Sequence, residues 1–200
     1  MISVYKLKPK FQQLLKPILI SLHRANVSAN QITISAIFLS LIIGILFWFA
    51  DLNSTLFLAL PIGLFLRMAL NALDGMMARM YQQQSKLGEI INELGDVISD
   101  LFIYFPLLKF ESSAFYLIIL FLCFSIVNEF SGVLAKAVSG QRRYDGPMGK
   151  SDRAFLIGLY GLLCFLEINI SNYASFIFLT INFLLFISTY LRVKRSLLNG

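Results

Sequence analysis

The chain has 200 residues, of which 58% are hydrophobic and only 14% are charged, and its mean hydropathy is +0.75. A soluble core needs no such excess of apolar residues, so this composition excludes an ordinary water-soluble domain and is typical of integral membrane proteins. The formal net charge of +6 comes without a soluble basic module that carries stacking aromatic side chains. We therefore assign the charge to membrane orientation and lipid contact, and we expect no nucleic-acid partner.

Residues 1–27 predict an amphipathic helix that lies along the membrane surface. Apolar side chains recur at helical spacing among lysines, with Phe11, Leu14, Leu15, Ile18, Leu19 and Leu22 between or after Lys6, Lys8, Lys10 and Lys16. Each lysine near an anionic lipid surface contributes about 1 kcal/mol to binding. Pro17 lies inside the pattern and predicts a break or a kink.

Six long apolar runs follow, each near the roughly 20 residues that a helix needs to cross a bilayer. They cover residues 31–50, 54–74, 88–108, 112–135, 153–169 and 173–191. We therefore expect an all-α integral membrane protein in which residues 28–200 form one domain of six transmembrane helices.

The basic residues predict the orientation of these helices. Of the 17 lysines and arginines, all but Arg67 and Lys109 lie in the N-terminal segment, in the loops at 75–87 and 136–153, or after Tyr190. Positively charged loops mark the cytoplasmic side of a membrane protein. Both termini are therefore expected in the cytoplasm.

The first span opens with Ser28-Ala-Asn30-Gln-Ile-Thr33. Either Ser28 or Asn30 suits the N-cap of a helix, where a side-chain oxygen accepts from a backbone N–H of the first turn. An ordinary helix start is thus the simplest interpretation of this segment from its residues alone.

The segment from Asn71 to Asp100 holds the densest polar pattern among the apolar runs. Asn71 and Asp74 lie three residues apart. Asn92, Asp96 and Asp100 follow at steps of four residues, so each set lies on one face of a helix. Acids inside a membrane are costly and mark functional sites there. If the two helices pack side by side, their polar faces can bind one cation between them. The alternative is a solvated helix connection above the lipid headgroups.

Several cations accompany this polar segment. Arg67 lies on the helical face of Asn71 and Asp74, where we expect it to pair with an acid such as Glu129 or with a substrate phosphate. The loop at 139–153 adds Arg142, Arg143, Lys150 and Arg153. A cytoplasmic loop carries cations in any case, but guanidinium groups also suit an acceptor phosphate.

The polar segment resembles the signature of the CDP-alcohol phosphatidyltransferases, Asp-x2-Asp-Gly-x2-Ala-Arg-x8-Gly-x3-Asp-x3-Asp, with every spacing intact. The matching residues are Asp74, Gly75, Ala78, Arg79, Gly88 and Asp96. Asn71 and Asn92 stand where the signature has aspartate, and an uncharacterised bacterial branch of the family is similar in carrying the same asparagines. The eight-residue gap between Arg79 and Gly88 argues against a chance match.

The resemblance implies a metal-dependent enzyme of phospholipid biosynthesis in the bacterial inner membrane. Such an enzyme transfers a phosphatidyl group from CDP-diacylglycerol (CDP-DAG) to an alcohol, releases CMP, works on the cytoplasmic face and forms a homodimer. By position, Asp74 and Asp96 bind Mg²⁺ or Mn²⁺, and Asp96 is the catalytic base. The donor-site candidates are Asn30, Thr33, Asp74, Gly75, Ala78, Arg79 and Gly88, and the acceptor-site candidates are Arg67, Arg142, Arg143, Lys150 and Arg153.

The two asparagines change the expected metal chemistry. An amide oxygen still binds a hard cation, but it carries no charge and cannot act as a base. Two carboxylates with one metal and the donor diphosphate leave the same formal charge as four carboxylates with two metals. We therefore expect one firmly held Mg²⁺ or Mn²⁺ near Asn71, Asp74, Asn92 and Asp96, with Asp100 able to restore charge for a weaker second ion.

The acceptor and the activity stay open at this stage. Glycerol 3-phosphate is the first acceptor candidate, because the basic loop suits a phosphate, and another polyol or a sugar is the second. The alternative function is a catalytically degenerate protein that binds CDP-lipid or scaffolds other lipid enzymes. CMP release that requires Asp96 would discriminate the two. A transporter is disfavoured because its pathway needs polar groups through the whole depth of the membrane.

Overall fold

The computed structural model describes residues 8–198, and all regular secondary structure in that range is helical, which confirms the all-α prediction. The long helices are α1 (Lys8–Arg24), α2 (Ala29–Trp48), α3 (Ala59–Met80), α4 (Lys86–Tyr104), α6 (Phe115–Ser139), α7 (Lys150–Phe165) and α8 (Ala174–Leu198). The short α5 (Leu107–Phe110) and 3₁₀ turns at Ser54–Leu58, Ser112–Ala114 and Ser171–Tyr173 join their ends. Lys6 of the predicted surface helix lies outside the described residues.

Each apolar run of the sequence coincides with one of the helices from α2 to α8. Four segments of the described chain are long and apolar enough to cross a membrane: Ala29–Trp48, Ser54–Met80, Ser112–Ser139 and Ser171–Leu198. They contain α2, α3, α6 and α8. The remaining two predicted spans correspond to α4, which carries charges at Lys86, Glu89, Glu93, Asp96 and Asp100, and to α7, which has only 16 residues.

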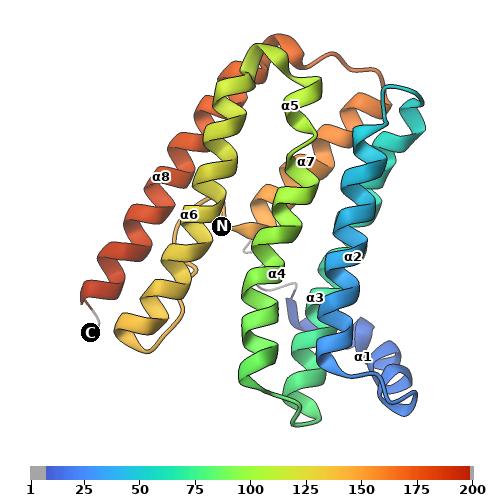
Figure 1. Cartoon of the computed structure of the whole chain (residues 1–200), viewed down its shortest axis with the longest axis vertical. Helices are drawn as coiled ribbons and strands as arrows, with labels where there is room; N and C mark the ends of the chain where they lie inside the picture. Colours follow the sequence, from blue (N-terminus) through green and yellow to red (C-terminus); the bar gives the residue numbers. More distant parts are fainter. Residues whose placement is uncertain (1–7, 199–200) are drawn as a thin grey trace.

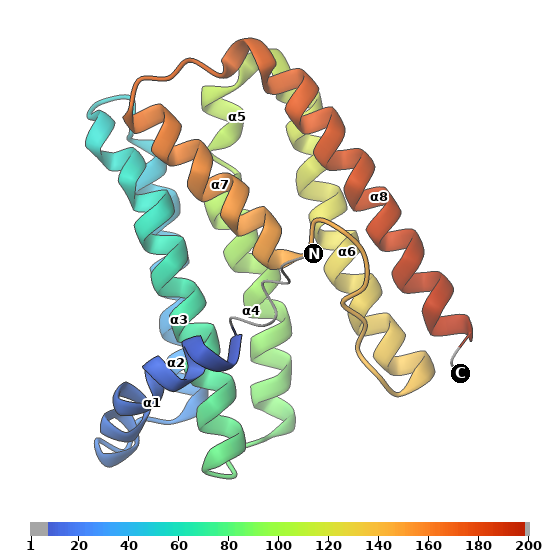
Figure 2. The ribbon, with the colours of Figure 1, turned by 180° about the vertical axis from the view of Figure 1, so that it is seen from behind.

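The helices form two groups that meet at α4. α2 packs along both α3 and α4, and α7 lies against α3, while α6 and α8 form a second, long pair (Figures 1 and 2). α4 also contacts α6 and so joins the groups. Buried apolar side chains from most of these helices, including Ile43, Leu60, Ile103, Phe121 and Leu185, make one continuous core. The polar faces of α3, α4 and α7 are thereby brought together.

α1 crosses the end of α3 (Figure 2). Its Leu15 and Leu19 are buried in one cluster with residues of α2 and α3, whereas Leu14 and Ile18 on its other face are exposed. The helix continues through Pro17, so the proline does not end it as a break would. The face with Leu15 and Leu19 thus packs α1 against the bundle, whereas Leu14 and Ile18 form an apolar strip that is exposed on the opposite face.

The close packing of α2 on α4 depends on Gly44. A methyl group there would lie 2.2 Å from the backbone oxygen of Phe102, which cannot swing away as a side chain can. We expect Gly44→Ala to lower the free energy of unfolding by about 1–3 kcal/mol, measured by thermal or denaturant unfolding in detergent. Gly158→Ala is the control, since its methyl group would meet Pro61 at an ordinary 3.5 Å. An equal loss in both variants would contradict the prediction.

Candidate active site

Asp74 of α3 is held by the first turns of α2. The Thr33 hydroxyl lies 2.9 Å from Oδ2 of Asp74, which is only 4% exposed. Of the two cap candidates, Ser28 is the one that caps α2, in a capping box with Gln31. The capped start of α2 therefore points Thr33 inward at a signature aspartate.

Asn30 approaches the start of α4, next to Gly88. A methyl group at Gly88 would lie 2.6 Å from the side-chain oxygen of Asn30, so the Asn30 side chain would have to move if any other residue stood there. Ser85 caps α4 by accepting from the Gly88 N–H at 3.0 Å. The structure thus brings together Asn30, Thr33, Asp74 and Gly88, which the signature resemblance assigns to one donor site.

Arg79 and Gly75 of the same signature lie toward the C-terminal end of α3. A methyl group at Gly75 would meet only the flexible Arg79 side chain, at 3.2 Å or more, and Arg79 is exposed. Ala78 is partly buried beside them. This part of the signature therefore leaves the backbone of α3 accessible to a large ligand.

Asp96 is half-buried on α4 and faces two cations. Its carboxylate pairs with the ammonium of Lys150, at the start of α7. Arg67 of α3 donates to the backbone oxygen of Asp96 at 3.3 Å, and its guanidinium lies 4.0 Å from Oδ1. Arg67 therefore ties α3 to α4 at the level of the predicted base.

A buried network of charges lies next to Asp96. Arg67 donates to Oδ1 of Asp100 at 2.7 Å, and Arg153 of α7 donates to Oδ2 at 2.9 Å. Arg153 also donates to Glu129 of α6 at 2.9 Å. The prediction that Arg67 pairs with an acid of the bundle is thus confirmed, but the acid is Asp100 and not Glu129. Arg67 lies on α3, and the packing of α4 places Asp100 closer to it.

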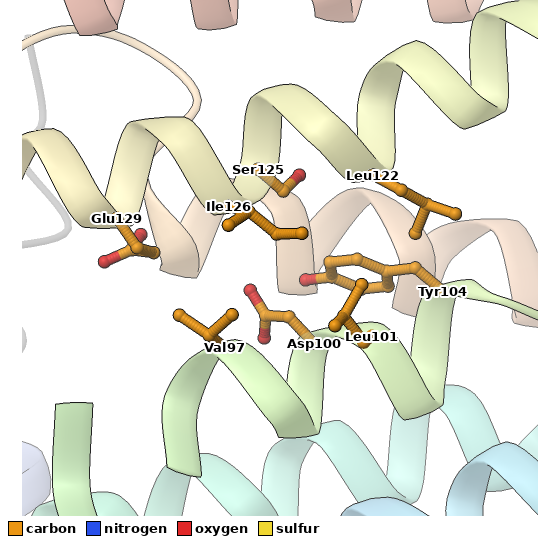
Figure 3. Close-up of a pocket in the computed structure, with 8 residues that line it drawn as sticks. All are labelled: Val97, Asp100, Leu101, Tyr104, Leu122, Ser125, Ile126 and Glu129. Carbon is orange, nitrogen blue, oxygen red and sulfur yellow. The ribbon is translucent and has the colours of Figure 1, made fainter. Parts of the chain in front are cut away.

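The surroundings of this network are closed. Figure 3 shows Asp100 and Glu129 directed into the space between α4 and α6, with the Tyr104 hydroxyl turned toward Asp100. This space is too narrow to hold a water molecule. The hydroxyls of Tyr104 and Ser125 have no hydrogen-bond partner among the described residues. Both oxygens of Asp100 accept from arginines. The metal role of Asp100 stays a prediction.

The cations of the basic loop differ in their partners: Arg142 pairs with acids, whereas Arg143 contacts a backbone oxygen. Arg142 pairs with Glu93 and donates to Glu129 at 3.0 Å. Loss of hydration lowers the pKa of Arg142, but the neighbouring Tyr144 and the acids Glu93 and Glu129 raise it above its ordinary value, so the group stays charged. Arg143 donates to the backbone oxygen of Arg195 at 3.4 Å.

The C-terminal helix holds this loop in place, which the sequence analysis missed. Arg192 is buried and donates to the backbone oxygens of Asn128 at 2.5 Å and of Asp145 at 3.3 Å. Arg195 pairs with the Asp145 carboxylate. The spacing of Ser188, Arg192 and Ser196 at steps of four residues is the sequence signal for this inward polar face.

An apolar cavity of about 480 Å³ lies between α3 and α7. The two helices run antiparallel (Figure 2), so the polar lining residues Arg67, Asn71, Lys150 and Ser151 gather at one end. The rest of the lining is apolar, including Phe65, Phe155 and Leu162. The polar end of the cavity therefore lies near Asp96, because Lys150 lines the cavity and pairs with Asp96.

The oxygen donors of the site suit a hard cation. Asp74 and Asp96 offer carboxylates, and the half-buried Asn71 and Asn92 offer amide oxygens, which Mg²⁺ and Mn²⁺ accept as ligands. In the described residues, no three His, Cys, Asp or Glu side chains gather closely enough to hold a metal by themselves. Any ion here would therefore depend on the asparagines as well as on the two aspartates.

Known proteins resemble this chain in sequence and in fold. Residues 26–188 match the model of the CDP-alcohol phosphatidyltransferase family. The inner membrane protein YnbA of Escherichia coli (strain K12) is 52% identical over 160 residues, 80% of this chain and 79% of that protein. Mycobacterium tuberculosis phosphatidylinositol phosphate synthase (PgsA1) has a similar fold at 20% identity in two crystal structures.

The two PgsA1 structures differ in what they hold. The complex with manganese and citrate superposes with a TM-score of 0.75, covering 90% of this chain and 87% of that one. The structure with CDP-DAG bound superposes with a TM-score of 0.77, covering 92% of this chain and 94% of that one. The family match includes every position of the signature from Asn71 to Asp96. This chain is a member of the CDP-alcohol phosphatidyltransferase family.

Proposed function

We propose that the chain transfers a phosphatidyl group from CDP-DAG to a small alcohol and releases CMP. The observation that carries the proposal is the placement of Asp74 and Asp96 on α3 and α4, which Arg67 ties together, with Thr33 on Asp74. Membership of the family supports the reaction class. The CDP-DAG bound to PgsA1 supports the donor by analogy of fold.

In the proposed reaction, Asp96 takes the proton from the acceptor hydroxyl. The acceptor oxygen forms a bond to the phosphatidyl phosphorus, the bond from that phosphorus to the bridging oxygen breaks, and CMP leaves with the electron pair. Asp74 and Asp96, with the amide oxygens of Asn71 and Asn92, would hold one Mg²⁺ or Mn²⁺. When bound, such an ion supplies neutralisation of the diphosphate charge.

The donor would lie along α2 and α3. Its nucleotide would approach Gly75, Ala78 and Arg79 where the backbone of α3 is accessible, with Asn30 and Gly88 beside it. The apolar cavity between α3 and α7 suits an acyl chain, since its walls are apolar and its polar end reaches Asn71.

For the acceptor, we assign the phosphate contact to Lys150, which already pairs with Asp96, and to Arg143. Arg67, Arg142 and Arg153 are committed to buried acids and are better explained as the frame of the site. A compact ammonium beside the base favours a phosphorylated alcohol such as glycerol 3-phosphate over an uncharged polyol or sugar.

We propose that α4 and α7 cross the bacterial inner membrane together with the four apolar helices, as one domain over residues 28–200. Their charges face one another inside the bundle, which removes the cost of lipid contact. α1, within residues 1–27, would lie at the interface, with both termini and the active site in the cytoplasm. The printed name of YnbA supports the location. A homodimer is proposed only by analogy with the family.

The second candidate function is a degenerate CDP-lipid-binding or scaffold protein. The observation that favours it is the Lys150 ammonium on Asp96, which occupies the predicted base. Together with Asn71 and Asn92, this pair lowers the negative charge available for a metal. If the chain is an enzyme, the ion pair between Lys150 and Asp96 has to break, and Lys150 then binds the acceptor phosphate.

The test is CMP release by the purified, detergent-solubilised protein. We expect release that requires CDP-DAG and Mg²⁺ or Mn²⁺, and that is fastest with glycerol 3-phosphate in a panel with inositol, inositol phosphate and glycerol. Omission of the metal is expected to stop release. Donor binding without release under every condition would favour the degenerate protein and overturn the proposed enzyme.

A further inference from the structure

A second cavity, of about 260 Å³, opens at the end of the bundle opposite the α3–α4 connection. It lies under the chain that joins α7 to α8, at the top of Figure 1. Its walls come from Phe57, Phe110 and Glu111, from Tyr160 of α7, and from the turn at 167–171. None of these residues belongs to the signature site.

Glu111 is the unusual feature of this cavity. The side chain is buried, with the residue only 2% exposed. Its Oε1 accepts from the Tyr160 hydroxyl at 2.9 Å and from the Ser171 hydroxyl at 3.2 Å. Its Oε2 has no hydrogen-bond partner among the described residues. A buried carboxylate without a counter-charge is costly, so this arrangement calls for a cation.

Within residues 8–198, no cation of the protein pairs with this carboxylate. The connections at this end of the bundle hold one basic residue, Lys109. Its ammonium is bound by the Asp51 carboxylate and by the backbone oxygen of Trp48. The lining that the described part of the chain provides contains a second acid, Glu167, and no lysine, arginine or histidine. The field in the cavity is therefore negative.

The size and the lining of the cavity indicate an organic cation. Phe57 and Phe110 pack edge to face with ring centroids 5.3 Å apart, and aromatic rings attract ammonium groups. The Phe110 ring already has the Lys109 ammonium 5.5 Å from its centroid, so Phe57 is the ring left for a ligand. A bare metal ion fits less well, because in the described chain no three metal-binding side chains gather in one place. Tyr160 and Ser171 hold Oε1 and thereby fix the orientation of the carboxylate.

We propose that this cavity binds a primary ammonium group, with Glu111 as its counter-ion and Glu167 at its mouth. The ammonium has two chemical sources at this place, a free small amine and the amine headgroup of a membrane phospholipid. The proposal stands apart from phosphatidyl transfer, since it uses no residue of the signature site.

The experiment measures binding of radiolabelled ethanolamine to the detergent-solubilised protein by equilibrium dialysis, without CDP-DAG. We expect one saturable site, weakened at least about tenfold in Glu111→Gln, because the variant keeps the shape but loses the charge. Asp51→Asn is the matched control, an acid at the same end that pairs with Lys109, and it should bind as the unchanged protein does. Equal binding by the unchanged protein and Glu111→Gln would overturn the proposal.

A lipid arm distinguishes the two sources. Native mass spectrometry of the protein with equal amounts of phosphatidylethanolamine and phosphatidylglycerol is expected to retain the amine lipid if the headgroup is the ligand, and to lose that preference in Glu111→Gln. Ethanolamine binding without a lipid preference assigns a free amine instead. If Glu111→Gln does not fold, Glu167→Gln at the exposed turn replaces it, with a severalfold loss expected. Unchanged binding of both probes in Glu167→Gln would then refute the site.

Discussion

Asp96→Asn is expected to lower CMP release by about 10³-fold or more, within the range that loss of a general base produces. Asparagine cannot accept the proton of the acceptor hydroxyl, and it also removes one of the two negative charges available to a cation. The shape of the side chain is kept, so the pairing of α4 with α7 should survive. Initial rates of CMP release at saturating CDP-DAG and acceptor measure the effect.

The control for Asp96→Asn is Glu89→Gln, on the same helix. Glu89 is exposed and pairs with Lys136, away from the signature contacts. We expect its rate to stay within a few-fold of the unchanged protein, since exposed ion pairs contribute little. A variant with Asp96→Asn that keeps more than a tenth of the rate would remove Asp96 from the role of base. A rate lost equally in both variants would point to general damage of α4.

Arg153→Met is expected to lower the free energy of unfolding by about 3–5 kcal/mol, because it leaves buried carboxylates without their cation. Arg153 is fully buried and bonds Asp100 and Glu129 at 2.9 Å each, beside a space that admits no water. Arg67 and Arg142 remain, but each then has to serve an additional carboxylate oxygen. Thermal and denaturant unfolding in one detergent measure the loss.

The matched control for Arg153→Met is Arg195→Met. Arg195 also pairs with an acid, Asp145, but its side chain is 52% exposed. Water replaces that partner, so the expected cost is about 0–1 kcal/mol. Adding Glu129→Gln to Arg153→Met should restore part of the lost stability, since one unpaired charge is removed. Equal costs for the two arginines would contradict the buried-network interpretation.

Sequence patterns alone predicted the long helices and the family. Apolar runs near bilayer length predicted the long helices α2, α3, α4, α6, α7 and α8, because burial in lipid demands continuous apolar side chains. The runs did not predict the short α5, which begins at the end of the run at 88–108. The spacing from Asn71 to Asp96 predicted the polar faces of α3 and α4. Periodicity carries this information because it reports which face of a helix avoids lipid.

Which polar groups meet depends on how the helices pack in three dimensions. Arg67 was expected to pair with an acid such as Glu129, and it pairs with Asp100, whereas Arg153 pairs with Glu129. Glu111 gave no sequence signal, since one acid at the edge of an apolar run looks like an ordinary helix end. Its burial follows from the turn before α8 closing over α7. A sequence pattern fixes the face on which a charge lies, whereas its partner depends on how helices distant in the chain rotate and pack against one another.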